Sequence, residues 1–413
     1  MNEATRPVRF RAGRLIDGTR AEAITDASIL VENGRIACVG SAAQVDAHPA
    51  AADATEVDHT AATVVPGLID GHVHLAYGHP DDRGWACAGG QPQGQSVWAL
   101  AAAQSALAAG VTTVRDAGSP AGVALDVRDL IEAGNLVASR VLACGPCLTT
   151  TGGHGEFIGV TADNAHELRL AVRRLAHRRP DAIKVMATGG SLDPHTNRRQ
   201  PQYTVDELAA LVAEAARFDL TVIAHANATE GIRRSVQAGV QTIAHCNFLA
   251  AEAGRLDPAA DVVAAMVAAG TYVDLNLGGA LTPLRDNDAS AVPPTEDRPH
   301  DRFELLRAMP DLVARTFFSS DQFGPRVSEF PTLLATATRR WRLEAEDVVW
   351  RATGLAARAL GLANLGTVTP GTIADLVALD GDLTADPDAL ARPSAVYSGG
   401  RLVASAGWIS ANR

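Results

Sequence analysis

The sequence is poor in aromatic residues, in cysteine and in long apolar runs. Aromatic residues make up 4% of the 413 residues, and the five cysteines are odd in number and scattered. This cysteine pattern excludes the disulfide framework of a small secreted domain. No uncharged apolar stretch reaches the roughly 18 residues that a membrane-spanning helix needs, and residues 1–15 lack the apolar core of a signal peptide. We therefore expect a cytoplasmic protein that does not enter a membrane.

Positive charge is also in short supply, since the formal net charge is -11 at pH 7. An acidic surface repels phosphate backbones and anionic lipids, so we do not expect nucleic acid or a membrane as a partner. At 47% hydrophobic residues, the chain is long and apolar enough for a large domain and an accessory domain. These properties suit a soluble enzyme.

Lysine is nearly absent. Of the 36 basic residues only Lys184 is a lysine, and all the others are arginine. Where any cation suffices the chain uses arginine, so the one position that keeps lysine can require a property that arginine lacks. A buried lysine can lose its proton and react, whereas arginine stays protonated. On composition alone, chance survival of a single lysine is an equally good explanation.

Both ends of the chain show a pattern of short strands and turns. Residues 8–15, 27–32 and 35–40 are β-like, and Asn33-Gly34 between two apolar runs indicates a hairpin. Residues 371–380 and 394–403 are β-like as well. We expect the two ends, residues 1–62 and 364–413, to form one small β-sandwich domain, with the rest of the chain inserted between them.

The middle of the chain, residues 63–363, alternates between apolar runs rich in β-branched residues and helical stretches. Strands are expected at 63–69, 112–116, 141–145, 182–187, 221–226, 242–246, 271–276 and 316–321, and helices at 97–109, 165–178, 205–218, 230–238, 258–269 and 346–360. This alternation is typical of parallel βα units, and eight strands suit a (β/α)8 TIM barrel of the α/β class. A doubly wound sheet shows the same alternation. The polar, proline-rich residues 281–302 form either a lid over the active site or a surface insertion.

A His-x-His pair ends the first of these strands, in the run Pro66-Gly67-Leu68-Ile69-Asp70-Gly71-His72-Val73-His74. Side chains two residues apart on a strand point to the same face, so His72 and His74 can reach one metal ion. Active sites of (β/α)8 barrels lie at the carboxyl ends of the strands, where this pair is expected. Imidazole is a ligand for zinc and several other transition metals.

This segment resembles the first-strand signature of the amidohydrolase superfamily, and further residues follow in that superfamily's order. Lys184 lies on the expected fourth strand, His225 ends the fifth, His245 the sixth and Asp321 the eighth. The resemblance implies a site for two divalent metal ions, with zinc as the expected metal. It implies that one ion is held by His72, His74 and Asp321, the other by His225 and His245, and that a carboxylated Lys184 bridges them.

Elementary chemistry agrees with this assignment. A neutral amine can attack carbon dioxide and become an anionic oxygen ligand, which a guanidinium cannot do. The resemblance implies a metal-bridging hydroxide that attacks the amide carbonyl, while the metal ions stabilise the oxyanion. It gives Asp321 the role of general base and then general acid, and it places His245 among the catalytic residues. A turn or helix-capping role is the alternative for Asp321.

Within the superfamily, two loops resemble the imidazolonepropionase-like and Xaa-Pro-dipeptidase-like branch. His154 lies in the loop after the third expected strand and Tyr203 in the loop after the fourth, and both loops face the substrate in that branch. Asn227 stands where dipeptidase-like members often have a tyrosine for the substrate carboxylate, which argues against a proline dipeptide. We expect His154, Asn227, Tyr203 and Gln322 to contact the substrate, with packing as the alternative for His154 and Tyr203.

The resemblance favours a binuclear hydrolase that cleaves the C–N bond of a small amide, such as a dipeptide, an N-acyl amino acid or a cyclic amide. A mononuclear imidazolonepropionase-like or deaminase-like hydrolase is the alternative, and the number of bound metal ions separates the two. A non-catalytic scaffold is a third interpretation, which the presence of all six candidate ligands disfavours. The sequence leaves open the substrate and whether the chain forms a homo-oligomer.

Overall fold

The computed structural model describes residues 6–78, 91–193, 195–253, 255–278, 281, 302–405 and 408–409. All but the two end residues of the predicted lid or insertion, 281–302, lie outside this part of the chain. Within the described residues, no helix is long and apolar enough to cross a membrane.

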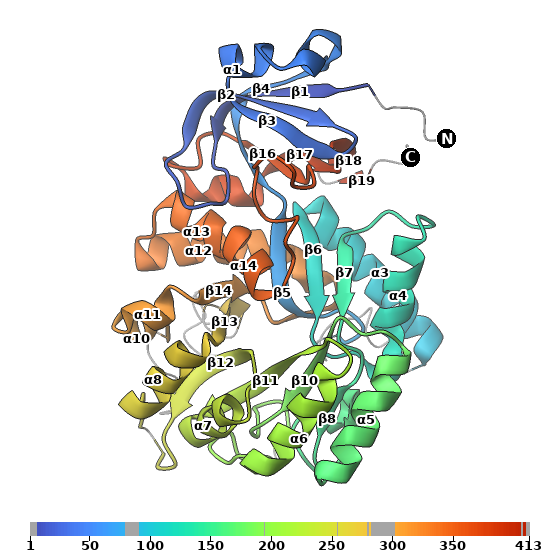
Figure 1. Ribbon diagram of the computed structural model, residues 1–413, viewed down its shortest axis with the longest axis vertical. Helices are drawn as coiled ribbons and strands as arrows, with labels where there is room; N and C mark the ends of the chain where they lie inside the picture. Colours follow the sequence, from blue (N-terminus) through green and yellow to red (C-terminus); the bar gives the residue numbers. More distant parts are fainter. Residues whose placement is uncertain are drawn as a thin grey trace, which may run out of the picture.

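Strands from both ends of the chain form one eight-stranded sheet, drawn in blue and red at the top of Figure 1. Its order is β19-β18-β17-β16-β4-β1-β2-β3. The bounds are Val8–Leu15 (β1), Ile24–Glu32 (β2), Arg35–Ser41 (β3), Thr55–Pro66 (β4), Leu376–Asp380 (β16), Pro393–Ser398 (β17), Arg401–Ser405 (β18) and Trp408–Ile409 (β19). Strand β4 joins the two ends, because it pairs in parallel with β1 and antiparallel with β16.

The Asn-Gly pair turns the chain between β2 and β3, as its sequence predicts. Asn33 and Gly34 both have positive φ, 50° and 77°, which the tight two-residue hairpin turn requires. The two strands pair antiparallel from Glu32 and Arg35 outward. The small helix α1 (Ala42–Asp46) follows β3, and Ser41 caps it through a reciprocal pair of hydrogen bonds with Gln44.

The middle of the chain builds parallel strands, which divide into two hydrogen-bonded sheets. The four-stranded sheet has the order β15-β5-β6-β7, and the seven-stranded sheet has the order β14-β13-β12-β11-β10-β8-β9. Their bounds are Leu68–His74 (β5), Val111–Asp116 (β6), Arg140–Ala143 (β7), Cys147–Thr149 (β8), Gly159–Thr161 (β9), Ala182–Met186 (β10), Thr221–Ala228 (β11), Thr242–Leu249 (β12), Tyr272–Asn276 (β13), Thr316–Ser319 (β14) and Gln322–Phe323 (β15).

Two backbone hydrogen bonds connect the sheets at their margins. The N–H of Asp181, just before β10, donates to the carbonyl of Ala143 at the end of β7 over 2.9 Å. The N–H of Asp321, just after β14, donates to the carbonyl of His72 on β5 over 2.8 Å. The strands β5-β6-β7 and β10 to β14 therefore follow one another in space in their chain order.

The first predicted strand, 63–69, needs a correction, since the chain is broken there into β4 and β5. Gly67 lies between them, and a Cβ on this residue would meet the Thr112 side chain at 2.0 to 2.8 Å. Glycine therefore allows the backbone to pass close to β6 as it leaves the eight-stranded sheet. Strand β5 therefore begins after Gly67, and it continues past the predicted end at residue 69 to the His-x-His pair.

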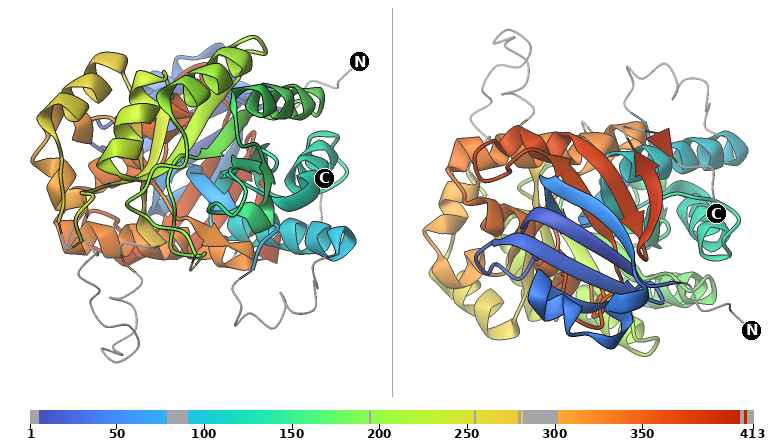
Figure 2. Two further views of the ribbon diagram at one scale, coloured as in Figure 1. Left: turned by 90° about the horizontal axis from the view of Figure 1, so that it is seen from below. Right: turned by 90° about the horizontal axis from the view of Figure 1, so that it is seen from above.

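Helices surround the parallel strands, as the view from below in Figure 2 shows. They are Pro92–Ala108 (α3), Val123–Glu132 (α4), Ala165–His177 (α5), Val205–Ala216 (α6), Thr229–Gln237 (α7), Ala260–Ala269 (α8), Arg302–Arg307 (α10), Pro310–Val313 (α11), Phe330–Trp341 (α12), Ala345–Arg351 (α13) and Gly354–Ala359 (α14). Polar caps start several of them: Asn164 caps α5, and Thr204 with Glu207 forms a capping box on α6. Strand β10 is buried along its whole length between such layers.

The predicted helix 346–360 is two helices, α13 and α14. Thr353 between them leaves helical geometry, with φ -139° and ψ -88°, and its hydroxyl donates to the Val349 carbonyl over 2.6 Å. A Cβ on Gly354 would meet the Gly18 carbonyl at 2.2 Å. The break between the two helices therefore lies where the chain just after β1, at Gly18, packs closely against Gly354. The periodicity of the sequence does not reveal this contact.

Candidate metal centre

The predicted ligands lie on four strands and one loop at a common edge. His72 and His74 end β5, Lys184 lies on β10, His225 on β11 and His245 on β12, and Asp321 follows β14. Parallel strands present their carboxyl ends to one side, so these side chains meet although they are far apart in the sequence.

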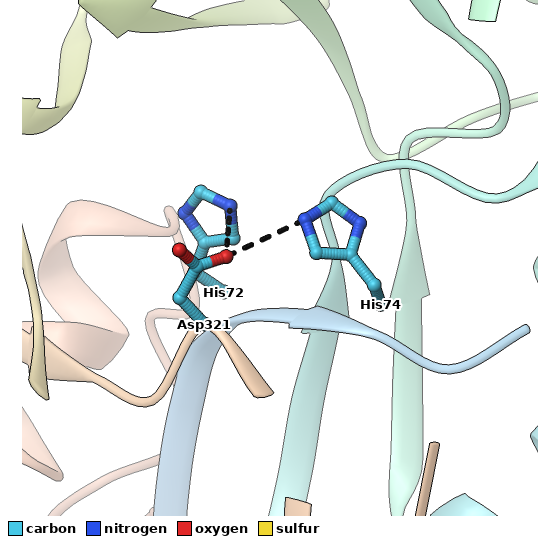
Figure 3. A group of neighbouring side chains, drawn as sticks. All are labelled: His72, His74 and Asp321. Carbon is cyan, nitrogen blue, oxygen red and sulfur yellow. Dashed lines mark ion pairs between the residues drawn. The ribbon is translucent and has the colours of Figure 1, made fainter. Parts of the chain in front are cut away.

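A pair of imidazoles and one carboxylate form the tightest group, which Figure 3 shows. The Oδ1 atom of Asp321 lies 3.5 Å from Nε2 of His72 and 3.5 Å from Nε2 of His74. The potential ligand atoms of this group all lie within 4.8 Å of one another. Ligands about 2.0–2.1 Å from a tetrahedral zinc ion are about 3.4 Å apart. The spacing of these atoms therefore fits one metal ion between them.

Hydrogen bonds at the far side of each ring orient the two histidines of β5. Nδ1 of His72 donates to Oδ2 of Asp274 over 2.7 Å, and Nδ1 of His74 donates to the Gly118 carbonyl over 2.9 Å. A carbonyl can only accept, so Nδ1 of His74 is the donor of this hydrogen bond. In both rings Nε2 is then the nitrogen on the side of Asp321 that would bind a metal ion, the arrangement typical of metal-bound histidines.

Lys184 is buried beside this group, with 1% of its surface exposed. Its Nζ lies 3.0 Å from Nε2 of His72. Burial lowers the pKa of Lys184, although the carboxylates of Asp321 and Asp274 partly oppose the shift. The neutral amine is therefore more accessible than in an exposed lysine, and this form can react with carbon dioxide.

The other two histidines continue the group on its far side. The His225 and His245 rings are 4.4 Å apart between centroids, and the His245 ring is 5.7 Å from that of His72. Nδ1 of His245 is 3.9 Å from Oδ2 of Asp321. Burial lowers the pKa of His225 and His245 well below the usual value, so both are neutral near pH 7. Neutral imidazole is the form that binds metals.

Two of these residues adopt a left-handed backbone conformation. His245 has φ 66° and Asp321 has φ 56°, values that residues with a Cβ rarely adopt. The Asp321 conformation is held by the hydrogen bond from its N–H to His72, and the N–H of His245 donates to Oδ1 of Asn276 over 2.9 Å. Strained backbone of this kind is concentrated at functional sites, where the surrounding structure stabilises it.

The carboxylate of Asp321 is the charged centre of the group. Burial alone would raise its pKa, but the neighbouring His72, His74 and Lys184 outweigh burial and lower the pKa to about 2. Asp321 is therefore ionised at any pH near neutrality. A carboxylate oxygen together with imidazole nitrogens is a donor set that zinc binds.

A cavity of about 410 Å³ opens above these residues. This volume is in the range of small-molecule sites. Its walls include all six predicted ligands and two of the four predicted substrate contacts, His154 and Gln322. Nδ1 of His154 is 2.8 Å from Oδ2 of Asp193, which holds the ring 4.5 Å from the His225 ring.

The other two predicted substrate contacts lie elsewhere. Tyr203 is buried, and its hydroxyl donates to the Ala162 carbonyl over 3.0 Å, so it has a packing role and not the predicted contact. Asn227 shares the face of His225 on β11, but its Nδ2 is 2.8 Å from Nε2 of His225, and its Oδ1 accepts from Asn247. The Gly189 carbonyl lies 3.1 Å from the same Nε2 and accepts from Nδ2 of Asn227 over 3.3 Å, so the amide of Asn227 packs beside the His225 ring and does not line the cavity.

Sequence reasoning missed Asp274 and Asp193, which orient His72 and His154. Asp274 lies in the middle of the buried strand β13, where a carboxylate needs a partner. A carboxylate within an otherwise apolar strand pattern is a signal in the sequence that could have identified Asp274. Three aromatic residues of the cavity wall, Tyr77, Phe157 and Phe323, were also missed, since single aromatics in loops carry no comparable pattern.

The Asp274–His72 contact gives a first testable prediction. Changing Asp274→Asn keeps the shape but removes the charge that accepts the Nδ1 proton of His72. We expect the affinity for zinc to fall about 10- to 100-fold, the usual effect of losing such a partner. Competition with a chromophoric chelator measures this affinity.

Asp347→Asn is the matched control for that variant. Asp347 is a buried carboxylate on α13 that accepts from Arg351 over 2.8 Å, away from the cavity. We expect it to lower thermal stability without changing zinc affinity. Equal zinc affinities of Asp274→Asn and the unchanged protein would contradict the orienting role of Asp274.

Comparison with known proteins agrees with this geometry. A sequence model described as the amidohydrolase family matches residues 63–403. An ochratoxinase from Aspergillus niger is 29% identical over 265 residues, 57% of this chain but only 54% of the relative, so the match spans about half of that protein. An imidazolonepropionase from Nocardia farcinica is 28% identical over 375 residues, 86% of this chain and 85% of the relative. The structure of a prolidase complexed with N-methylphosphonate-L-proline aligns with a TM-score of 0.81 and 26% identity, over 97% of this chain and 100% of that one.

Proposed function

Because the chain belongs to the amidohydrolase family, we propose that it is a binuclear metal-dependent hydrolase that cleaves the C–N bond of a small amide. Dipeptides, N-acyl amino acids and cyclic amides are the substrate classes. The observation that carries the proposal is the lone lysine, Lys184, buried with its amine 3.0 Å from a histidine of the candidate metal centre. A buried lysine in contact with ligating groups serves no evident packing purpose.

The donor set supports an assignment of ligands to two zinc ions. In this proposal His72, His74 and Asp321 would hold one ion, His225 and His245 would hold the other, and a carboxylated Lys184 would supply an anionic oxygen ligand shared between the two. The His72, His74 and Asp321 atoms have the spacing for one ion, and the remaining two rings lie beside them. When bound, the ions would supply an acidified water and polarise the amide carbonyl.

In this proposal, residues of the chain transfer the proton and bind the substrate. Asp321 is ionised, so its carboxylate can accept a proton from the attacking water and return it to the leaving nitrogen. His154 lines the cavity with Nδ1 tied to Asp193, so Nε2 is the ring nitrogen that would be available to a substrate. We propose that His154 donates from Nε2 to a substrate oxygen and that Gln322 presents its amide to the substrate.

We also propose that the parallel strands close into one (β/α)8 barrel, residues 63–363. The hydrogen bonds from Asp181 to Ala143 and from Asp321 to His72 support this closure at both margins. The eight-stranded sheet would then be the β-sandwich domain of residues 1–62 and 364–413. The predicted boundary at residue 63 lies within β4 (Thr55–Pro66), the strand that leads from that sheet into the barrel.

Removal of metal is the direct test of the proposal. Dialysis against a chelator should lower the hydrolysis of responsive amides at least about 100-fold, because metal catalysis contributes several kcal/mol and 1.36 kcal/mol is tenfold. Readdition of zinc should restore the rate. Protein that hydrolyses no amide in a library of dipeptides, N-acyl amino acids and cyclic amides when loaded with zinc would contradict the proposed function.

The number of metal ions bound after zinc is added back distinguishes the proposed function from a mononuclear alternative. The relative named imidazolonepropionase covers more of the chain than the ochratoxinase, and the tightest ligand group holds three residues. These observations favour a mononuclear hydrolase as the second candidate. Elemental analysis of the reconstituted protein decides between them, with about two zinc ions per chain expected for the first function and one for the second.

A further inference from the structure

We propose that the substrate carries an aromatic or similarly bulky apolar group next to the scissile amide. This group packs on the aromatic wall, which we define as Tyr77, Phe157 and Phe323. The inference rests on the proposed function and names the substrate class of that site. It concerns the wall of the cavity that the candidate ligands do not form.

The three rings form one continuous surface in the cavity. The Tyr77 ring is 5.0 Å from that of Phe157 and 5.3 Å from that of Phe323, measured between centroids. The Phe323 ring lies 5.4 Å from the ring of His74, a candidate ligand. These distances fall in the range of favourable aromatic contacts, so a further ring can pack against the same group.

The aromatic wall lies directly beside the proposed reaction site. Phe323 follows Asp321 by two residues on the chain, and β15 pairs with β5 so that Phe323 is opposite His74. A group that packs on Phe323 is therefore adjacent to the ligands that would polarise the amide. The apolar group and the scissile bond thus belong to neighbouring parts of one molecule.

The outer part of this wall is exposed to solvent in the free protein. Phe157 is 43% exposed, and Leu192, which also lines the cavity, is 50% exposed. Large apolar side chains at the rim of a polar catalytic cavity lose favourable free energy unless a ligand covers them. An apolar substituent of the substrate removes this surface from water, whereas a small polar substrate leaves it exposed.

The wall is held in place from behind. Nε1 of Trp98 on α3 donates to the Tyr77 carbonyl over 3.1 Å. Gly324, next to Phe323, has φ +50°, and a Cβ there would meet Nε1 of Trp98 at 2.2 Å. The chain therefore passes against the indole and fixes the Phe323 backbone. A prearranged wall binds an apolar group without the entropy cost of ordering the side chains on binding.

Matched substrate pairs test the inference in the zinc-loaded protein. The pairs differ only by a phenyl ring: N-acetyl-phenylalanine with N-acetyl-alanine, Ala-Phe with Ala-Ala, and phenylacetyl-glycine with acetyl-glycine. They place the ring on either side of the amide. We expect at least one pair to show a kcat/KM ratio of about tenfold or more in favour of the phenyl member, equivalent to about 1.4 kcal/mol.

Phe157→Ala is the informative variant, because Phe157 is half-exposed and its removal leaves the core intact. It should reduce the ratio of that pair to within about threefold. Phe218→Ala is the matched control: Phe218 follows α6, is 42% exposed and does not line the cavity. It should keep the full ratio. Ratios near one for every pair, or a ratio that Phe157→Ala leaves unchanged, would overturn the inference.

A binding experiment keeps this inference distinct from the proposed function. Calorimetry should show 3-phenylpropionate binding about tenfold more tightly than propionate, with the difference lost in Phe157→Ala and retained in Phe218→Ala. If no amide is hydrolysed while this difference is present, the hydrolase proposal fails and the apolar subsite stands. If amides are hydrolysed and both acids bind equally, only the inference is overturned.

Discussion

Lys184→Arg should lose at least about 10³-fold in kcat/KM and retain less than one zinc ion per chain. Metal catalysis contributes several kcal/mol, and 1.36 kcal/mol corresponds to tenfold in rate. The variant keeps a positive charge of similar length but cannot present a neutral amine to carbon dioxide. Because Lys184 is buried beside His72, a permanent guanidinium there also repels the metal ion. Steady-state kinetics and elemental analysis measure both losses.

The scarcity of lysine makes the chemistry of this position directly observable. Protein prepared with ¹³C-bicarbonate should show one lysine carbamate resonance, since Lys184 is the only lysine. The variant Lys184→Arg should lose that resonance. Arg401→Lys is the control: it places a lysine on the exposed strand β18, where the amine stays protonated, and should add no carbamate and leave activity unchanged. Metal-loaded Lys184→Arg with full activity would exclude the proposed bridge.

The family resemblance and the expected strand ends predicted which side chains meet at the candidate site, but they did not predict the hydrogen-bond partners of these side chains. A His-x-His pair at the end of an apolar run predicts two rings on one face, and β5 ends with that pair. The contact between Asp274 and His72 spans 202 residues. It depends on how β13 and β5 lie in space, which no local period of the sequence encodes.

Asn227 shows that the strand on which a residue lies does not determine the role of its side chain. The alternation of β11 places Asn227 on the same face as His225. Whether its amide reaches the cavity depends on the neighbouring strand. There Nδ2 of Asn247 on β12 donates a hydrogen bond to Oδ1 of Asn227. The Tyr203 hydroxyl likewise has a carbonyl partner outside the cavity, which agrees with the packing alternative for this residue.

The sequence also did not predict two interruptions of secondary structure at tightly packed points. Gly67 lies between β4 and β5 where Thr112 leaves no room for a side chain, and Thr353 separates α13 from α14 beside Gly18. Both features arise where the eight-stranded sheet meets the parallel strands. Their residues are ordinary in the sequence, and only the packing of distant segments gives them meaning.

Asp321→Asn should lower kcat by about 10² to 10⁴, the range for losing a positioned proton donor and acceptor. Asparagine keeps the shape and one ligating oxygen, so part of the metal affinity should remain. Asp375→Asn is the matched control, because Asp375 is a buried carboxylate just before β16 that pairs with Arg140 of β7 over 2.9 Å. It should affect thermal stability but not kcat.

The role of Asp321 as proton carrier, and not only as ligand, can be separated by the leaving group. An anilide with a strongly electron-withdrawing ring departs without full protonation of its nitrogen, whereas an alkyl amide needs the returned proton. At saturating zinc, Asp321→Asn should therefore lose much less kcat for the activated anilide than for the alkyl amide. If saturating zinc restores the alkyl amide rate of the variant, Asp321 is a ligand alone and the proton-transfer role is excluded.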